Sequence, residues 1–575
     1  MKKRLFTAMA LVMLAIFLPL TVAHAFETFT AETETRLYKP EKSYNGYVQT
    51  CPGNNTGGGT VYLIDLWGNV YHSWVTKGGT PRLQEDGTLW SIFYIQDWDG
   101  NVIWDFVPTR DAPEAGTILG DHDQRKMWNK KLNQWTMLIN CNRNLTAAEA
   151  LAAGVDPAIV ANPGTRLNQY NFVIEVNMDK KIVWRWNQWD HACQTQNPAW
   201  PNYVSDIRNA PGKFDINWRT DAQQPNSQPG LGRDWLHVNS IDYDEESGHV
   251  AINSRSFSTF WVVDHDKTFV STTDFAANAA AAAGPNGDII YRFGNPSFYK
   301  AGKAPSFLSE GDQQMYGSHN IQWIRAYAWD RPRAEAGDTW PDPMGYTKSG
   351  VALPGAGNFL IFDNGCFNPT GMRSRILEID PRIGASGTVE VPHGQYIDPT
   401  VAGYQSTSAT YRKNKQVTWL YQSASQSSFY SSFISSMIRL PNGNTSIDAG
   451  GNGHMFEVTP SGEVVWEYIM PGFAGPNVKY VMSDSNLVWQ TDSNQYRGTP
   501  YFTYRHSRYA ADFPGFTGKN LTSKGTLTGL VPQLTGEGRT KPASVTYFGF
   551  GFPPTGGIGG GGGGVGGGSG GGGGY

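Results

Sequence analysis

The sequence has little charge, few cysteines and, after its first 25 residues, no long apolar run. Only 17% of its 575 residues are charged and the formal net charge is −4, so the chain offers no basic surface for nucleic acid. No transmembrane segment is expected after the first 25 residues, because no later apolar run approaches the roughly 20 residues of a spanning helix. The chain is rich in aromatic residues, with 20 Trp, 27 Tyr and 28 Phe, enough for a large globular core.

The first 25 residues have the pattern of a secretory signal. They begin with lysine and arginine, continue with an apolar stretch and end on the small residues Ala23 and Ala25, so cleavage before Phe26 is expected. A retained membrane anchor is the competing interpretation, which the shortness of the apolar stretch disfavours. The expected location is therefore periplasmic or secreted.

The chain has four cysteines, Cys51, Cys141, Cys193 and Cys366, whose spacing resembles no metal-binding motif. An exported protein reaches a compartment in which disulfides form and persist. We therefore predict one or two structural disulfides rather than free thiols, with three pairings open.

One short pattern recurs along the chain: two aliphatic residues, an aspartate, a glycine three positions later and an aromatic residue soon after. Each copy reads as strand, tight turn, strand. A second hairpin precedes most copies, for example Ser240–Ser254, so two hairpins in series make a four-stranded antiparallel unit. Repetition of this unit predicts an all-β fold, a β-propeller of about six blades with long loop insertions. A β-sandwich is the alternative, and it explains the regular recurrence less well. The clearest copies are Leu63–Trp74, Asp97–Trp104, Ile174–Trp186 and Phe456–Tyr468.

The chain divides into five parts. Residues 1–25 are the signal, 26–60 an N-terminal extension, 61–480 the propeller, and 481–550 a segment that packs on the propeller or closes it. Residues 551–575 are almost pure glycine, which cannot form a packed core, so a disordered tether is expected there. Such a tail also suits self-association or attachment to the cell surface.

Histidines recur at one position of the repeat. Three of them open the first strand of a unit, and a fourth lies in a connection between a second and a third strand. In a propeller, both positions lie at the same end of the axis, where strands of different blades approach one another. Two arginines lie in connections of the same kind. The side chains expected at this end are His122, His237, His319, His454, Arg255 and Arg373.

A pocket of histidines with arginine admits three kinds of chemistry: metal binding, anion binding, and nucleophilic attack by an imidazole. No Asp, Glu or Cys is placed obviously beside the histidines, which disfavours a metal, although three histidines alone can hold zinc. Arginine beside histidine favours a tetrahedral oxyanion, because guanidinium offers paired donors to two oxygens. We therefore expect neither a metal nor another cofactor.

Six segments, in this order, carry a resemblance to a known family: "LHVNSIDYD", "NSRSFSTFWVVD", "GSHNIQWI", "FLIFDNG", "SRILEID" and "GGNGHMFEV". Over about Tyr44 to Pro471 the chain resembles the bacterial arylsulfate sulfotransferases, which are periplasmic six-bladed propellers. The resemblance implies transfer of a sulfuryl group from a phenolic sulfate ester to a phenol, without a nucleotide donor. It also implies a ping-pong route through a sulfated histidine, with small phenolic sulfate esters and phenols as partners.

The resemblance further implies roles for individual residues. His454 matches the nucleophile, while His237 and His319, with an arginine, would offset charge on the sulfuryl oxygens and a neighbouring acid would protonate the departing phenolate. The family arginine that closely follows "FDNG" is absent, and Arg373 is the candidate to replace it. The separate N-terminal β-domain of larger members is also absent. Residues expected to bind the substrate are Arg255, Asn239, Asn320, Asn364 and His122.

Two other functions compete with sulfuryl transfer. A non-catalytic secreted propeller would act as a binding or assembly subunit through its glycine-rich tail. A quinone-dependent dehydrogenase has blade repeats that look superficially similar, but it would need Asp, Glu and Asn residues for calcium and cofactor at the axis, and the sequence shows no such set.

Overall fold

The computed structural model describes residues 34–52, 59–113, 116, 118–161, 170–218, 235–306, 308–325, 353–366, 368–407, 411–423, 429–473, 478–483, 486–491, 503–530 and 534–535. The expected signal and the glycine-rich tail lie outside these residues. In the part of the chain that the structure describes, no helix has the length and apolar character needed to cross a membrane.

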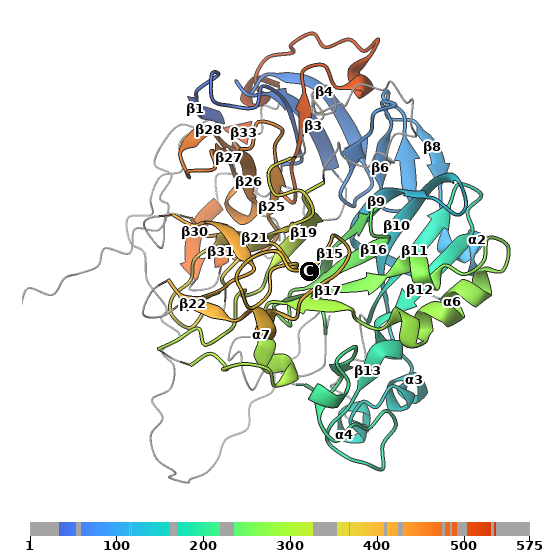
Figure 1. The fold of residues 1–575 in the computed structure, drawn as a ribbon. Coiled ribbons are helices and arrows are strands. Elements are labelled where there is room, and N and C mark those ends of the chain that lie inside the picture. The colour runs from blue at the N-terminus through green and yellow to red at the C-terminus, as the bar shows by residue number, and fades with distance from the viewer. Residues whose placement is uncertain are drawn as a thin grey trace, which may run out of the picture.

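Six antiparallel sheets are arranged as blades around one axis, which confirms the predicted six-bladed propeller (Figure 1). From the axis outward, blade 1 holds β32 (Ser507–Ala510), β2 (Gly46–Thr50), β3 (Gly59–Asp65) and β4 (Val70–Thr76), and blade 2 holds β5 (Arg82–Leu83), β6 (Leu89–Ser91), β7 (Tyr94–Gln96) and β8 (Val102–Asp105). Blade 3 holds β9 (Leu119–Asn129), β10 (Gln134–Arg143), β11 (Tyr170–Asn177) and β12 (Ile182–Asn187), and blade 4 holds β15 (Val238–Asp244), β16 (His249–Ser254), β17 (Thr259–Asp264) and β18 (Tyr291–Phe293). Blade 5 holds β19 (His319–Trp323), β20 (Phe359–Asp363), β21 (Arg375–Ile379) and β24 (Val417–Tyr421), and blade 6 holds β25 (Ser436–Arg439), β26 (Thr445–Ala449), β27 (His454–Val458), β28 (Val464–Ile469) and, outermost, β1 (Glu34–Tyr38).

Short elements decorate the blades. Paired strands are β13 (Ala192–Cys193) with β14 (Phe214–Asp215), β22 (Tyr404–Ser406) with β23 (Arg412–Asn414), β29 (Gly472–Phe473) with β33 (Leu534–Thr535), and β30 (Val478–Ser483) with β31 (Asn486–Thr491). The α-helices are α2 (Pro108–Asp111), α3 (Ala147–Ala152), α4 (Pro157–Ala161), α5 (His265–Thr268), α6 (Phe275–Ala283), α7 (Pro399–Ala402) and α8 (Leu527–Leu530).

The recurring sequence pattern is the turn between the two outer strands of a blade. In the first copy, Asp65 accepts hydrogen bonds from the backbone N–H of Trp67 and of Asn69, each at 2.9 Å. Gly68 has a φ of 88°, which a residue with a Cβ rarely adopts. The aspartate of the pattern therefore accepts the backbone N–H groups of the tight turn, and the glycine adopts the backbone conformation that the turn requires.

The tryptophan of the pattern joins neighbouring blades. On three outer strands, its indole N–H donates to a backbone carbonyl in the outer turn of the next blade. Each such bond links two neighbouring blades, and the one from Trp466 also satisfies a buried donor. The bonds run from Trp104 to Met178 (2.9 Å), from Trp419 to Pro460 (2.9 Å) and from Trp466 to Leu66 (2.8 Å).

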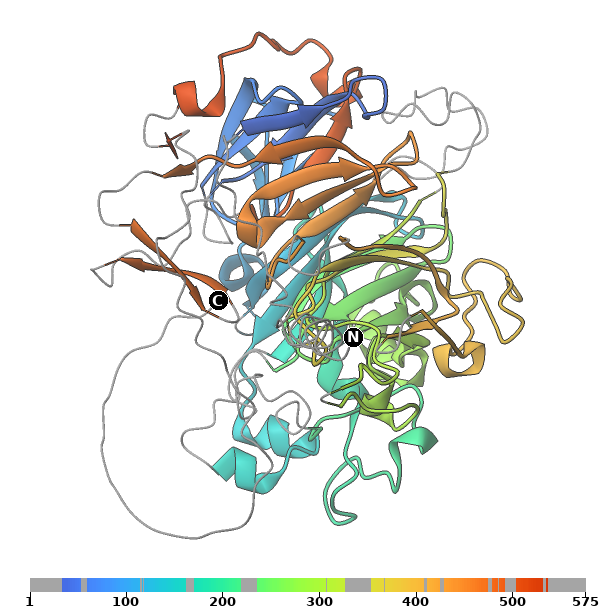
Figure 2. The ribbon, with the colours of Figure 1, turned by 90° about the vertical axis from the view of Figure 1, so that its left-hand side faces the viewer.

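The ring is closed by a strand from the C-terminal part of the chain. β32 pairs antiparallel with β2 as the innermost strand of blade 1, and in Figure 2 this red strand lies among the blue strands of that blade. At the other end of the chain, β1 pairs with β28. The blades thus reach beyond residues 61–480 in both directions, because closing a ring brings both ends of the repeat into its sheets.

The predicted disulfides are absent. Cys51, Cys141, Cys193 and Cys366 are all buried thiols, so the prediction is wrong. Cys141 lies on β10, Cys193 on β13, and Cys366 between β20 and β21. The propeller places the four on different blades and insertions, and a disulfide needs two Cα atoms within about 7 Å.

Candidate active site at one end of the axis

Three inner strands carry a histidine at or near their start, beside an irregularity of the sheet. The pairing register shifts near the start of β9, β15 and β19, so each strand carries an extra residue there. His122 has a φ of 57°, His237 of 48°, and Asn320, next to His319, of 55°. Positive φ at a bulky residue costs about 1–3 kcal/mol and persists where the surroundings impose it. Such bulges redirect side chains, here toward the axis.

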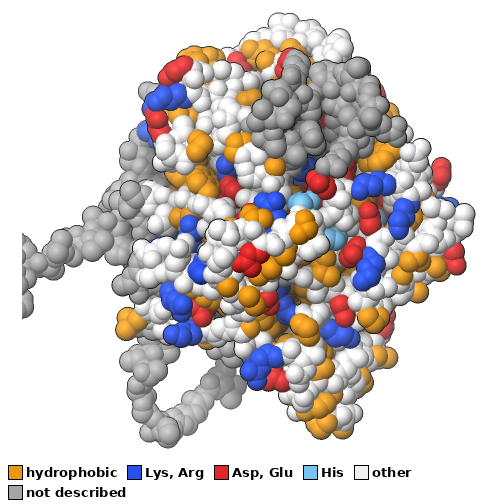
Figure 3. Space-filling model, in the orientation of Figure 1, with side chains coloured by type: hydrophobic (Ala, Val, Ile, Leu, Met, Phe, Trp, Pro, Cys, Tyr) orange, Lys and Arg blue, Asp and Glu red, His pale blue; other side chains and the backbone are white. Residues whose placement is uncertain are grey.

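The structure brings the three histidine rings together. The ring centroids of His122 and His237 are 4.8 Å apart, and those of His237 and His319 are 6.2 Å apart. The ring of Tyr504, shortly before β32, lies 6.2 Å from that of His122. Side chains from blades 3, 4 and 5 and from the closing segment therefore share one place. Figure 3 shows one face of the molecule, on which histidine side chains lie near the centre with acidic and basic side chains around them.

Asn364 fixes the tautomer of His319. Its side-chain N–H groups donate to the carbonyls of Ser431 (2.8 Å) and Ile434 (3.2 Å), so its amide oxygen faces His319. That oxygen lies 2.6 Å from Nδ1 of His319, which must therefore be the protonated nitrogen. The lone pair of the neutral ring then lies on Nε2.

His319 is held in its neutral form. Burial, followed by the charges of Arg255 and His237, keeps the pKa of His319 well below its usual value of 6.5. Arg255 lies in the connection between β16 and β17, and its Nη2 is 3.8 Å from Sγ of Cys366. Burial raises the pKa of that thiol to about 11, with Arg255 opposing the rise. A cation therefore stands beside a neutral, nucleophilic imidazole.

His122 is paired with an acid. Its Nδ1 contacts the carboxylate of Asp121, and Asn171 donates to the other oxygen of that carboxylate at 3.0 Å. Burial raises the pKa of Asp121, but His122 and His237 outweigh it and bring the pKa below its usual value. An ionised Asp121 orients His122 and offsets the charge of a protonated ring.

The structure places His454 and Arg373 among other contacts. His454 is the first residue of β27, two strands out from the inner strand, and its Nε2 lies 2.9 Å from Oε1 of Glu467. Its ring stacks on Phe456 with centroids 4.7 Å apart. Arg373 forms an ion pair with Glu310 rather than turning to the three histidines.

Two of the asparagines expected to bind substrate tie blades together instead. Asn239 donates to the carbonyl of Ser318 at 2.9 Å, which joins blade 4 to the segment before β19. The side-chain oxygen of Asn320 accepts from the backbone N–H of Met437 in blade 6 at 3.3 Å. These side chains hold the strands that carry the histidines.

Sequence reasoning missed Asp121, Tyr504 and Arg505. Asp121 directly precedes His122, and this adjacency was a usable signal. Arg505 donates to the carbonyl of Asn239 at 2.7 Å and so lies at the same end of the axis. It precedes the closing strand, which contains no copy of the repeat pattern, so nothing in the sequence placed it there.

The described residues contain no group of three or more His, Cys, Asp and Glu side chains arranged to hold a metal ion. The three histidines gather with Arg255 and the carboxylate of Asp121. Such a set offers a nucleophile, a proton-transfer pair and a fixed cation.

Comparison with known proteins gives a family match over part of the chain and weak similarity to solved structures. No curated protein matches the chain. A solved protein of unknown function from Bacteroides caccae is similar over 74% of this chain and 93% of its own, at 8% identity and a TM-score of 0.32. Residues 149–329, which contain His237, Arg255 and His319, match the model of the arylsulfotransferase (ASST) family, and this confirms the resemblance for that part of the chain.

Proposed function

We propose that the protein transfers a sulfuryl group from a phenolic sulfate ester to a phenol, through a sulfated histidine at the end of the propeller axis. The observation that carries the proposal is the environment of His319: a neutral ring, Nδ1 bound to Asn364, and Arg255 beside it. The family match over residues 149–329 supports an arylsulfotransferase-like enzyme.

His319 is the nucleophile that the geometry favours, whereas the sequence resemblance pointed to His454. Attack needs an imidazole nitrogen with an available lone pair, and Asn364 leaves that lone pair on Nε2 of His319. Nε2 of His454 already lies 2.9 Å from Glu467. His454 would have to leave this carboxylate before it could attack sulfur.

The first half-reaction balances as follows. Nε2 of His319 bonds to sulfur while the bond between sulfur and the phenolic oxygen breaks. Positive charge then develops on the ring, and the Asn364 oxygen that accepts from Nδ1 stabilises it. In this proposal, Arg255 and His237 donate to the sulfuryl oxygens and offset their charge. The departing phenolate takes a proton from the imidazolium of His122, which Asp121 orients.

The second half-reaction reverses these steps. Neutral His122 accepts the proton of the incoming phenol, whose oxygen bonds to sulfur as the bond between sulfur and Nε2 of His319 breaks. His319 returns to its neutral form and His122 to its protonated form. One residue thus serves as acid and then as base, as a ping-pong reaction requires.

The test measures release of p-nitrophenol from p-nitrophenyl sulfate in the presence of phenol. His319→Ala should abolish release, and His454→Ala should retain it if its ring retains only a packing role with Glu467 and Phe456. Peptide mass spectrometry after incubation with donor alone should locate a sulfate on the peptide that contains His319. A sulfate on the His454 peptide, with activity lost in His454→Ala alone, would return the role to His454.

A non-catalytic role remains the second candidate, favoured by the glycine-rich sequence at residues 551–575. In that case the protein would be a secreted binding or assembly subunit that self-associates or attaches to the cell surface. Deletion of Pro554–Tyr575 would then abolish assembly, as measured by cell fractionation and light scattering. If the protein without Pro554–Tyr575 assembles as well as the full chain, this role is wrong.

Export is part of both proposals. The mature protein should begin at Phe26 and be recovered from the periplasm or the medium. N-terminal sequencing of the purified protein tests this, and a retained segment 1–25 would contradict it.

A further inference from the structure

A strained turn leads into the inner strand of blade 6. Ile434 has a φ of 47° and Ser435 a φ of 89°, and β25 begins at the next residue. Positive φ is unfavourable for residues with a Cβ, and it is a true outlier for a β-branched residue such as isoleucine. Both residues are buried. Such a conformation persists where the surroundings impose it, and it is typical of functional sites.

Serine hydroxyls hold the turn in this conformation. Oγ of Ser435 accepts from the backbone N–H of Gly450 at 3.1 Å and donates to Oγ of Ser431 at 2.9 Å. Oγ of Ser431 in turn accepts from the backbone N–H of Gly451, also at 2.9 Å. Gly450 and Gly451 lie between β26 and β27. The two hydroxyls therefore tie the strained turn to the neighbouring connection of the same blade.

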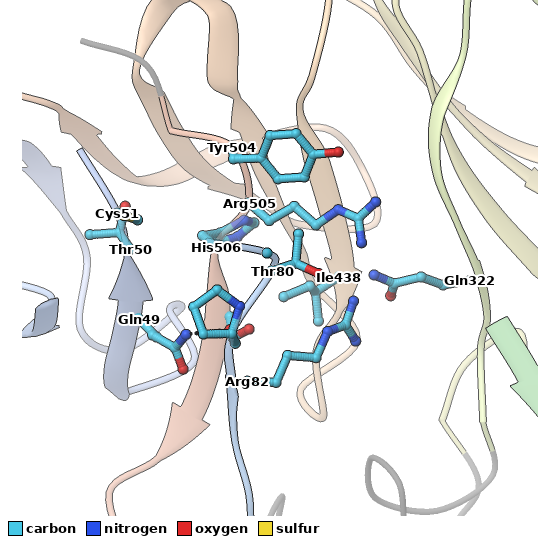
Figure 4. A pocket seen from close by; sticks show the side chains of 13 residues that line it. Gln49, Thr50, Cys51, Thr80, Arg82, Gln322, Ile438, Tyr504, Arg505 and His506 are labelled. Atoms are coloured by element: carbon cyan, nitrogen blue, oxygen red, sulfur yellow. Dashed lines mark hydrogen bonds between the residues drawn. The ribbon is translucent and has the colours of Figure 1, made fainter. Parts of the chain in front are cut away.

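The closing segment also packs against the turn. Ile434 and Tyr504 form a small apolar cluster of their own, and each is 6% exposed. Figure 4 shows Tyr504 and Arg505 extending side by side from the closing segment, and Tyr504 lines the same pocket as Ile438 of β25. The ring of Tyr504 lies 6.2 Å from that of His122. The turn thus adjoins the histidine cluster at the end of the axis.

Two backbone carbonyls at the turn point at Asn364. Its side-chain N–H groups donate to the carbonyls of Ser431 at 2.8 Å and Ile434 at 3.2 Å. The amide cannot flip without breaking both bonds, so its oxygen stays directed at Nδ1 of His319. A flipped amide would present an N–H group to Nδ1, and the ring proton would then lie on Nε2. The lone pair that the proposed reaction uses would be lost.

The other blades use a similar distortion in another way. Positive φ at His122, His237 and Asn320 redirects histidine side chains near the starts of their inner strands. In blade 6, the corresponding positions before the inner strand hold Ile434 and Ser435. The distortion there directs carbonyl groups, rather than an imidazole, toward the site. Blade 6 therefore contributes to the orientation of a histidine that blade 5 supplies.

We propose that Ser435 is a positioning residue for His319. Its hydroxyl keeps the strained turn in place, the turn holds the amide of Asn364, and the amide keeps the ring proton of His319 on Nδ1. The effect on activity rests on the proposed function, in which His319 attacks sulfur. The effect on the tautomer of His319 is independent of that function.

The first experiment measures the tautomer directly. Protein labelled with nitrogen-15 in its histidine rings is studied by NMR at neutral pH, and the His319 signals are assigned by their loss in His319→Gln. The wild type should carry the ring proton on Nδ1 alone, whereas Ser435→Ala should show a second population with the proton on Nε2. An unchanged His319 spectrum in Ser435→Ala overturns the proposal, whatever reaction the protein performs.

The second experiment is a double-mutant cycle on the release of p-nitrophenol. Ser435→Ala should lower kcat about 10²-fold with little change in KM, because a small displacement of a catalytic group causes a loss of this size. Ser435→Ala combined with Asn364→Ala should be no slower than Asn364→Ala alone, because Ser435 acts through that amide. Losses that multiply in the double variant would show that Ser435 acts by another route. If the wild type releases no p-nitrophenol, the proposed function fails and the tautomer experiment alone decides on Ser435.

Two further variants serve as controls. Ser435→Gly lacks the hydroxyl but adopts positive φ without strain, so it should melt no lower than Ser435→Ala and still show the altered tautomer. Ser247→Ala removes a hydroxyl that donates to Asp244 in the turn between β15 and β16, and it should keep the kcat and the His319 tautomer of the wild type. Full kcat and an unaltered tautomer in Ser435→Gly would show that the hydroxyl has no positioning role.

Discussion

At the scale of single residues, the chemistry depends on what holds each histidine more than on the histidines themselves. Eleven histidines occur in the chain, and several of those described contact carboxylates away from this site. His265, for example, lies between Glu175 and Asp266. His319 differs because its partner is an uncharged amide, which orients the ring without favouring its charged form. Sequence motifs identify such a histidine but not its partner.

Asn364 should act as a positioning residue for His319. In Asn364→Ala, Nδ1 loses its acceptor, so the ring can rotate or adopt the other tautomer. We expect kcat to fall about 10²- to 10⁴-fold with little change in KM for p-nitrophenyl sulfate, as when the orienting acid of a catalytic triad is removed. Steady-state kinetics with purified variants measure this split.

The control for Asn364→Ala is Asn209→Ala, at an exposed asparagine far along the chain. Thermal unfolding should show both variants folded. If Asn364→Ala instead raises KM and leaves kcat unchanged, the amide binds substrate and does not orient the ring.

His506 makes stability depend on pH in a predictable direction. Burial, with a contribution from Arg508, lowers the pKa of His506 from 6.5 to about 3. Between pH 6.5 and about pH 3, His506 is protonated in the unfolded chain but stays neutral in the folded protein. This contribution is therefore complete above pH 6.5 and falls by roughly 1.4 kcal/mol per pH unit as the pH drops toward 3.

Urea unfolding of the wild type and His506→Gln between pH 7 and pH 4.5 tests this slope, with the ionic strength kept constant. The stability advantage of the wild type over the variant should shrink as the pH falls. A difference that stays constant over this range would mean that His506 titrates normally in the folded protein.

At the scale of elements, the inner strands carry the site and the outer turns carry the architecture. The residues of the Asp-Gly turns and the tryptophans that bond between blades recur along the sequence, so the propeller could be predicted from this pattern. The bulges at the starts of β9, β15 and β19 leave no comparable pattern, because they arise where strands of different blades meet. The positions of the histidines could be predicted because they follow the repeat. The roles of Asp121 and Asn364 could not, because they depend on contacts that form only in the folded ring.

The closing strand β32 should depend on a buried ion pair. Arg508 donates to Oε2 of Glu457 at 2.9 Å and to Ser446 at 3.1 Å, and both charged side chains are fully buried. Arg508→Met would leave the Glu457 charge buried without its cation, at a cost of about 3–5 kcal/mol. Urea unfolding measures the loss.

Two companion variants separate charge from packing. Arg508→Met combined with Glu457→Gln should recover part of the lost stability, because the uncompensated charge is gone. Arg110→Met at an exposed ion pair should change stability little. If Arg508→Met costs no more than Arg110→Met, the pair does not hold the closing strand.

At the scale of the whole molecule, sequence reasoning reached the blade count and a segment within residues 481–550 that packs on the propeller or closes it, but it did not identify the two strands that meet there, and it was wrong about the cysteines. Residues 46–50 and 507–510 contain no copy of the repeat, yet they pair as neighbours in blade 1, since a ring must close. The four cysteines have no short-range pattern, and only the blade arrangement shows that they stay apart. Features that depend on contacts between distant segments were the ones that the sequence did not reveal.

Ring closure predicts different effects for two C-terminal truncations. Removal of residues 503–575 takes away β32, Arg505 and Arg508, which leaves the inner edge of β2 unpaired and removes the buried ion pair between Arg508 and Glu457 of blade 6. An open ring with an exposed strand edge should aggregate or unfold at a markedly lower Tm. Removal of only Pro554–Tyr575 leaves every described contact in place and should keep the Tm of the full chain. Circular dichroism melting and size-exclusion chromatography compare the two, and a soluble 503–575 deletion with an unchanged Tm would show that the closing strand is dispensable.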